Sequence, residues 1–171
     1  MGSLRVWKGH DARKGLTHYV YGMERNSPKG IGYLLERTSR MVKLNYSQTF
    51  KQHGFDVTPE QWVLLENLYL DDGQTQNDLA SGSFKDAPTV SRILNILETK
   101  GYLIRESRTG DKRIRQVQLT PKGKELVISM KPMVDVLREQ GWDHLSEEDY
   151  TTFVRIINTI FDNYAGSGSS K

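Results

Sequence analysis

Apolar residues recur every three or four positions along most of the chain, which is the spacing of helices that bury one face. From Ile31 this spacing predicts a helix that runs to about His53, where Gly54 supplies a C-terminal stop. Residues 58–61 (TPEQ) then combine an N-cap, a proline in the first turn and a capping box. A second helix follows, and we expect it to end at residues 71–73 (DDG).

A third, short helix is expected to open at Gln74 or Thr75. Residues 81–83 (SGS) predict a turn after it, with Phe84 packed beneath that turn. A fourth helix is predicted over residues 86–101, from an Asp-Ala-Pro start to a glycine stop. Its apolar positions form one stripe, made up of Val90, Ile93, Leu94 and Leu97.

The pattern then changes to that of a β-hairpin. Residues 102–107 predict a short strand, and residues 109–111 (TGD) predict a tight turn. On the return strand Val117 and Leu119 alternate inward, whereas Ile114 is out of phase with them.

Two more helices complete the pattern. Thr120 and Pro121 repeat the cap-plus-proline start, and Ser146 caps the last helix with Asp149 at its third position. The fifth helix has its apolar face at Leu126, Met130, Met133 and Leu137. The last helix carries the most regular stripe of the sequence, formed by Phe153, Ile156, Ile157, Ile160, Phe161 and Tyr164. The predicted order is therefore four helices, a hairpin and two helices.

Charge is unevenly distributed along this pattern. The net charge is only +3, but residues 85–115 hold eight basic and four acidic residues. Residues 135–163 reverse the balance, with seven acidic and two basic residues. A basic middle and an acidic C-terminal part indicate two faces with different functions. Glu98 and Lys100 are expected to be ordinary helix-surface charges.

The composition excludes several classes of protein. The sequence contains no cysteine, which excludes disulfides and thiol-based redox sensing. No run approaches the roughly 18 apolar residues of a membrane span. Residues 1–22 lack the apolar core of a signal peptide. We therefore expect a cytoplasmic protein.

We expect neither an enzyme nor a bound metal or cofactor. The four histidines do not have the spacing of a metal site. The sequence has no G-x-S-x-G motif and no phosphate-cradling glycine loop after a strand. The acidic pairs Asp71-Asp72 and Glu147-Glu148 fall at helix boundaries, where solvation and the helix dipole explain them.

A short helix, a tight turn, a second helix and a β-hairpin follow one another in the order of a winged helix-turn-helix, a DNA-binding arrangement. The second helix of the pair would lie in a major groove with its polar face outward. The basic hairpin would lie beside a minor groove, whose negative potential attracts arginine. The predicted DNA contacts are Thr75, Lys85, Thr89, Ser91, Arg92, Asn95, Arg108, Lys112, Arg113 and Arg115.

The residues DKR at 111–113, followed after five residues by LTPKG at 119–123, resemble the wing signature of the MarR family of bacterial transcriptional regulators. Three upstream segments are similar to that family's helix-turn-helix: 78–80 (DLA), 88–92 (PTVSR) and 97–102 (LETKGY). The resemblance covers residues 31–164, and its motifs stand in the family's order. One departure is the run of small residues within 81–87, which leaves the start of the recognition helix open by one or two residues.

The resemblance implies roles for individual residues. Arg113 would enter the minor groove, and Asp111 would pair with Arg113 and fix its direction. The first helix and the last two would form a dimerisation domain, so that a homodimer binds a pseudo-palindromic operator. A pocket beside that domain would take a small aromatic or phenolic ligand. Tyr46, His53 and Trp62 fall where this pocket is expected, although ordinary core packing explains each of them as well.

The predicted fold is mainly α with a small β-hairpin wing: a winged helix-turn-helix joined to a helical dimerisation domain. We assign residues 23–57 to an N-terminal dimerisation helix, 58–120 to the DNA-binding domain and 121–165 to C-terminal dimerisation helices. Residues 1–22 are interpreted as a tag or a disordered arm, and 166–171 as a linker or tag remnant.

The predicted function is that of a ligand-responsive repressor that binds double-stranded DNA. Two alternatives remain open. One is a ligand-independent architectural DNA binder. The other is a winged helix that docks a protein, which the polar recognition face at Thr89, Ser91 and Arg92 argues against.

Overall fold

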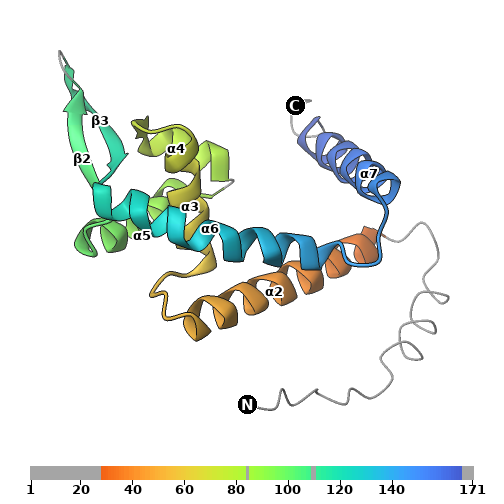
Figure 1. The fold of residues 1–171 in the computed structure, drawn as a ribbon. Helices are drawn as coiled ribbons and strands as arrows, with labels where there is room; N and C mark the ends of the chain where they lie inside the picture. Colours follow the sequence, from red (N-terminus) through yellow and green to blue (C-terminus); the bar gives the residue numbers. More distant parts are fainter. Residues whose placement is uncertain (1–27, 84, 109–110, 167–171) are drawn as a thin grey trace, which may run out of the picture. The chain divides into compact units, whose positions relative to one another are not determined.

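The computed structural model describes residues 28–83, 85–108 and 111–166. These residues form six helices and a small antiparallel sheet (Figure 1). In chain order the elements are α2 (Pro28–Gln52), α3 (Pro59–Leu70), β1 (Gln74–Thr75), α4 (Gln76–Ser83), α5 (Ala87–Thr99), β2 (Leu103–Arg108), β3 (Asp111–Leu119), α6 (Pro121–Gly141) and α7 (Glu147–Gly166). The predicted fold class, mainly α with a hairpin wing, is confirmed.

Local hydrogen bonds fix the helix starts where the sequence predicts them. The Thr58 hydroxyl accepts from the Gln61 amide at 3.2 Å, and the Gln61 side chain accepts from the Thr58 amide at 3.1 Å. At the start of α6 the Thr120 hydroxyl accepts from the Gly123 amide at 3.0 Å. Ser146 and Asp149 form a reciprocal pair at the start of α7. Each bond satisfies an amide that lacks a partner within the helix.

The two predicted glycine stops are also present. Gly54 and Gly101 have φ values of +77° and +75°, a left-handed conformation that side chains disfavour. The amide after each glycine donates back into the helix: Phe55 to the Phe50 carbonyl at 2.9 Å, and Tyr102 to the Leu97 carbonyl at 3.0 Å. This 6→1 bond is the hallmark of the Schellman motif.

The predictions for residues 74–83 need correction. Gln74 and Thr75 form a short strand, β1, which pairs with Val117 and Gln116 of β3, so the helix starts at Gln76. Residues 81–83 are the last turn of α4 rather than a separate turn, and the Ser83 hydroxyl donates to the Leu79 carbonyl at 2.6 Å. The expected packing of Phe84 lies outside the described residues.

The sheet has the strand order β1-β3-β2, so β3 is its central strand. Its regular register runs from Leu103↔Leu119 to Ser107↔Arg115 and then breaks, because Arg108 pairs with Asp111. Residues 112–114 are thus additional residues on one strand, so Ile114 is not part of the regular register that contains Val117 and Leu119. Asp111 opens β3, and residues 109–110 of the predicted turn lie outside the described residues.

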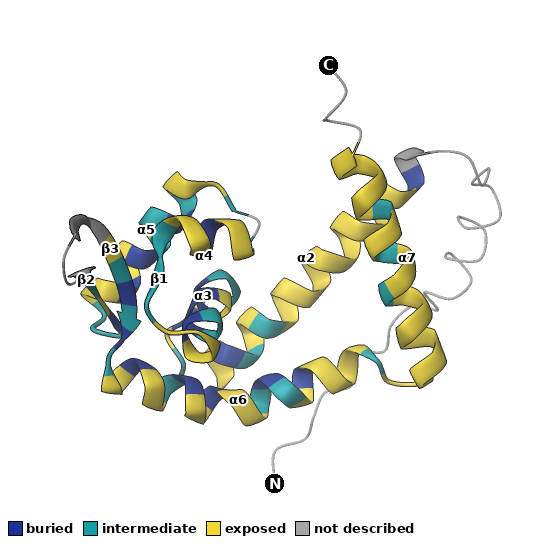
Figure 2. Ribbon diagram, turned by 90° about the horizontal axis from the view of Figure 1, so that it is seen from above, coloured by how far each residue is buried: buried dark blue, intermediate teal, exposed yellow. Residues whose placement is uncertain are grey.

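The core lies between α3, α4, α5, the sheet and α6 and includes Phe50 near the end of α2; Figure 2 shows dark, buried segments on these elements. Fully buried side chains include Leu64, Leu65, Leu68, Leu79, Leu94 and Leu97. The buried face of α6 differs from the prediction. It is formed by Gly123, Val127, Met130, Val134 and Leu137, whereas Leu126 and Met133 are only partly buried. Met130 and Leu137 are thus buried as predicted, while Val127 and Val134 are buried in place of Leu126 and Met133.

The chain divides into two compact units at Leu44 and Asn45, within α2. In the first unit α2 exposes large apolar side chains, among them Ile31, Leu34, Leu35 and Met41. In the second unit α7 contains no buried residue. Of the described helices, none has both the length and the apolar character needed to cross a membrane.

Candidate nucleic-acid interface

Thr75 is built into the start of α4. Its hydroxyl donates to Asp78 Oδ2 at 2.7 Å and accepts from the Asp78 amide at 3.2 Å. The hydroxyl bond to the carboxylate, together with a bond of 3.1 Å from the Thr75 amide to the same oxygen, holds the pKa of Asp78 below its usual value. Thr75 therefore positions α4, and a contact of its hydroxyl with DNA would have to share these bonds.

Asp86 fixes the start of the predicted recognition helix α5. One carboxylate oxygen accepts from the Thr89 amide at 2.7 Å and the other from the Thr89 hydroxyl at 2.9 Å. The same bonds lower the pKa of Asp86. The start at Ala87 resolves the one- or two-residue ambiguity left by the sequence. Thr89 is half-buried and acts as part of the cap. Lys85 is also half-buried, and its backbone amide donates a hydrogen bond to the Ala80 carbonyl at 3.1 Å.

The outer face of α5 is polar and accessible. Arg92 and Asn95 are exposed, and Ser91 is half-buried beside them. Arg92 and Asn95 are three residues apart and so share one helix face. Both side chains can form two hydrogen bonds to a base edge, arginine to guanine and asparagine to adenine. This face can therefore read a major groove.

A polar hollow of about 260 Å³ joins α5 to the sheet. It brings together three predicted contacts, Ser91, Asn95 and Arg115. It also contains two residues that sequence reasoning missed, Gln76 and Arg105. The hollow therefore combines side chains from α4, α5, β2 and β3 in one surface.

Arg105 connects β2 to the recognition helix. Its guanidinium pairs with Glu98 and also donates to the Ser91 carbonyl at 3.5 Å, and only 14% of its side chain is exposed. Its Nε is buried and has no hydrogen-bond partner in the described part of the chain. Glu98 is therefore not the ordinary surface charge that was expected. The sequence offered one signal for this pair: a glutamate at the end of a helix, followed by an arginine in the next strand.

Lys100 likewise has a specific partner. Its ammonium group lies 2.8 Å from the Asp56 carboxylate and 2.6 Å from the Asp56 carbonyl. This link holds the end of α5 against the loop before α3, and it corrects the expectation of a solvated charge.

The wing extends from the helices as the two-stranded ribbon β2–β3 (Figure 1). Its backbone places Arg108, Asp111, Lys112 and Arg113 at the outer end of the hairpin, while their side chains lie outside the described part. Arg115, nearer the base, is exposed. The roles expected for Arg113 and Asp111 in a minor groove remain predictions.

The residues predicted for a ligand pocket are only partly brought together. Tyr46 and Trp62 both stack edge-to-face on Phe50, with ring centroids 5.9 and 6.3 Å away. Trp62 is 2% exposed and belongs to the core, while His53 is exposed and bonds the Thr49 carbonyl at 2.9 Å. A larger hollow of about 370 Å³ lies elsewhere, at the junction of α6 and α7, and is lined by Arg138, Trp142 and Tyr150 among others. Across the described residues, no cluster of three or more potential metal ligands occurs.

This chain is similar to known proteins in sequence and in structure. The family model described as "MarR family" matches residues 55–114, which include α3, the helix pair α4–α5 and strand β2. MepR of Staphylococcus aureus, in a structure of its complex with DNA, is 31% identical; the match covers 78% of this chain and 97% of that one, with a TM-score of 0.73.

Two further solved structures share the fold. BpsR of Bordetella bronchiseptica is 23% identical, with 82% of this chain and 99% of that chain covered at a TM-score of 0.72. A probable transcriptional regulator of Pseudomonas aeruginosa is 24% identical, with 76% and 96% covered at a TM-score of 0.65. These matches cover a larger share of the chain than residues 55–114, so the likeness is not confined to the helix-turn-helix.

Proposed function

The chain belongs to the MarR family of DNA-binding transcription regulators, and we propose that it is a homodimeric repressor of a pseudo-palindromic operator, released by a small aromatic or phenolic ligand. The observation that carries this proposal is the recognition face of α5. Arg92 and Asn95 are exposed there, beside a hollow that contains Arg115 of the wing.

The homodimer is supported by the apolar stripe of α7. Phe153, Ile156, Phe161 and Tyr164 are between 44% and 65% exposed in the single chain. A stripe of this regularity on a long helix indicates burial against another surface. A second copy would cover the stripe and would also set two recognition helices about 34 Å apart, one turn of the DNA.

Release by a ligand is supported by similarity alone. In BpsR, DNA binding is regulated by 6-hydroxynicotinic acid, a small aromatic compound. A ligand that binds better to a dimer with the wrong spacing would weaken operator binding by shifting the population. We take Tyr46, His53 and Trp62 as the first residues to test for such a ligand.

Fluorescence anisotropy tests the proposal directly. Labelled duplexes that tile the DNA around the gene are titrated with protein over a series of salt concentrations, with random duplex as competitor. We expect tight, steeply salt-dependent binding to one pseudo-palindromic tile that resists the competitor. Equal binding to every tile would favour an architectural binder, and no binding at low salt would favour a protein-interaction module.

Oligomeric state and ligand response complete the test. Sedimentation of the purified protein at micromolar concentration is expected to give a dimer, and a monomer would refute the proposed mode of operator binding. A panel of aromatic acids and phenols added to the operator complex is expected to contain compounds that release it. Unchanged affinity across the panel would refute the ligand-responsive part.

A further inference from the structure

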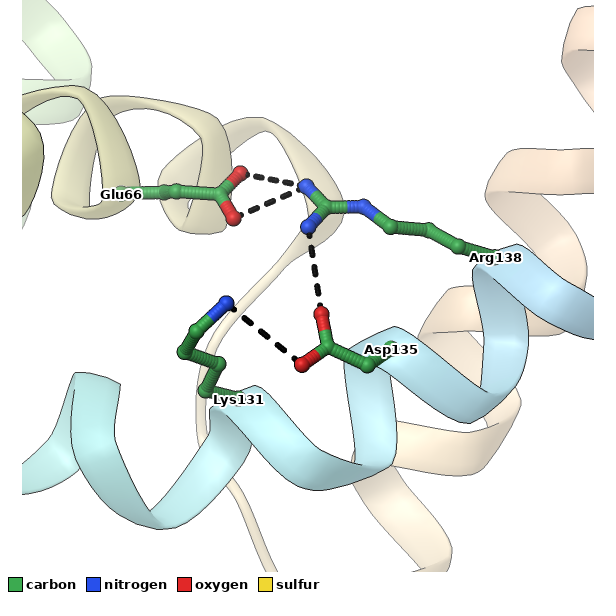
Figure 3. A network of polar contacts seen from close by, with 4 residues as sticks. All are labelled: Glu66, Lys131, Asp135 and Arg138. Carbon is green, nitrogen blue, oxygen red and sulfur yellow. Dashed lines mark hydrogen bonds and ion pairs between the residues drawn. The ribbon is translucent and has the colours of Figure 1, made fainter.

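Arg138 on α6 forms a link between helices that are distant in sequence. Its Nη2 donates to both carboxylate oxygens of Glu66 on α3, at 2.7 and 2.8 Å (Figure 3). Its Nη1 lies 3.5 Å from Asp135, which in turn lies 3.4 Å from Lys131 one turn earlier on α6. The network therefore orients the guanidinium from two sides and directs it at α3.

The Glu66 carboxylate is the more enclosed partner. Only 19% of its side chain is exposed, compared with 46% for Arg138. The hydrogen bond to Glu66 raises the pKa of Arg138 further above its usual value. Tyr46 of α2 also lies within the electrostatic reach of Arg138. Removal of Arg138 would leave a largely enclosed carboxylate without its partner, which favours a shift of α3 toward water.

The Arg138–Glu66 pair and an ion pair near the start of α6 are polar attachments at opposite ends of this helix. At the start of α6, Lys124 pairs with Asp72 at 3.0 Å, and Asp72 also accepts from the Leu119 amide at 2.9 Å. Arg138 lies 14 residues further on, which is about 21 Å along a helix. Over this length of about 21 Å, a displacement of about 1 Å at the Arg138 end changes the angle between α6 and α3 by about 3°.

Pro132 lies inside α6 between the two attachments. A proline removes the hydrogen bond to the fourth preceding carbonyl, here that of Ile128, and so permits a helix to bend. Val134 and Leu137 bury the segment beyond Pro132, but apolar contact is not directional. The hydrogen bonds of the Arg138–Glu66 pair are directional, and they fix the orientation of this segment of α6 relative to α3.

Helix α3 packs against the elements that carry the predicted DNA-binding residues. It contacts α4, α5 and β3 as well as α6, and Leu64, Leu65 and Leu68 are fully buried. We propose that Arg138 is a positioning residue for DNA recognition: by holding Glu66, it fixes α3 and the recognition helix at one angle to the part of α6 beyond Pro132. This inference rests on the proposed homodimer, in which that angle sets the spacing of the two recognition helices.

The test compares a full operator, found by the tiling experiment, with a duplex that carries one half-site. A half-site engages one lobe and is insensitive to spacing. We expect Arg138→Gln and Glu66→Gln each to weaken full-operator binding about tenfold, within the usual range of coupling between sites. Half-site binding should change by less than twofold. The double variant should bind like the single variants, because both remove the same link.

Lys51→Gln is the control, since it also removes one positive charge and Lys51 is an exposed residue outside this network. We expect wild-type affinity for both duplexes, and Arg138→Lys should recover part of the full-operator affinity. Wild-type affinity of Arg138→Gln for the full operator, or equal weakening on both duplexes, would overturn the inference. So would additive effects in the double variant. If Arg138→Gln fails to fold, as judged by circular dichroism, Glu66→Gln decides by the same criteria.

The experiments distinguish failure of the proposed function from failure of the role inferred for Arg138. A wild-type protein that is monomeric, or that binds no tile preferentially, refutes the dimeric regulator before any variant is compared. A dimeric wild type with a preferred tile and unaffected variants refutes only the role of Arg138.

Discussion

Gly123, in the first turn of α6, is a position where one methyl group is expected to have a large effect. A Cβ on this residue would lie 2.0 Å from the Tyr102 carbonyl oxygen and 3.2 Å from Leu119 Cδ2. The oxygen belongs to the backbone and also accepts from the Thr120 amide at 3.1 Å. The Thr120 hydroxyl donates to the Gly101 carbonyl at 2.7 Å, so this turn is held tightly against the corner after α5.

Gly123→Ala must therefore move α6 away from that corner by more than 1 Å or break these hydrogen bonds. Overpacking in a close contact typically costs about 1–3 kcal/mol, and a lost buried hydrogen bond adds about 1 kcal/mol. We expect a total of about 2–4 kcal/mol. For a chain of this length each kcal/mol lowers Tm by about 2–4 °C, which gives a decrease of roughly 4–16 °C.

Thermal unfolding followed by circular dichroism at fixed protein concentration measures this decrease; the concentration is fixed because a dimer's Tm depends on it. Gly141→Ala is the control, since it lies in the same helix with nothing within 4 Å of its Cβ position. Alanine there should stabilise slightly, by up to about 1 kcal/mol. A Gly123→Ala protein that melts within about 2 °C of wild type would refute the argument from close approach.

Three further predictions concern the recognition helix, the wing and the dimer. Asp86→Ala should lower Tm at pH 7, because the Thr89 amide loses its acceptor. The pKa of Asp86 is lower in the folded protein than its unfolded value of about 3.8, so the stabilisation is present above about 3.8 and disappears as pH falls through the folded pKa. The Tm values of wild type and Asp86→Ala should therefore converge as pH decreases. Arg113→Ala should weaken operator binding and reduce the slope of log affinity against log salt by about 0.9, as measured by anisotropy; an unchanged slope would mean that Arg113 neutralises no phosphate. Ile156→Asp should convert the dimer to a monomer in sedimentation, and a persistent dimer would show that the α7 stripe is not its interface.

Local features of the fold could be predicted from the sequence because a few adjacent residues determine them. The capping box at Thr58 and the glycine stops at Gly54 and Gly101 depend on atoms within one helical turn. The wing strands were predicted for the same reason, from alternation over several residues. Strand β1 was missed because two residues cannot show alternation, and Gln74 and Thr75 are extended only because β3 offers an unpaired edge.

The polar side chains of the candidate site could be predicted by type but not by partner. The DNA contact of Thr89 stays a prediction, and the sequence did not show that its hydroxyl donates to Asp86. Arg105 was counted as part of a basic segment, and its position under α5 depends on how β2 packs against that helix. The pairing of Arg138 with Glu66, 72 residues apart, is even less local. Which surface charges meet depends on the tertiary arrangement, and an exposed pair leaves no pattern in the sequence.

The contacts at the two ends of α6 differ in a way that bears on regulation. At Gly123 the contact is steric, between backbone atoms, and has essentially one arrangement. At Arg138 the contact is an ion pair, and 46% of the arginine side chain is exposed, so this contact can open without a clash between backbone atoms, although the enclosed Glu66 carboxylate then loses its partner. A ligand that shifts α6 would therefore act mainly at the Arg138 end, with the Gly123 end as the fixed point. Loss of the Arg138–Glu66 link should accordingly lower operator affinity in the absence of ligand and also reduce the further decrease that a ligand causes, because part of the change has already occurred.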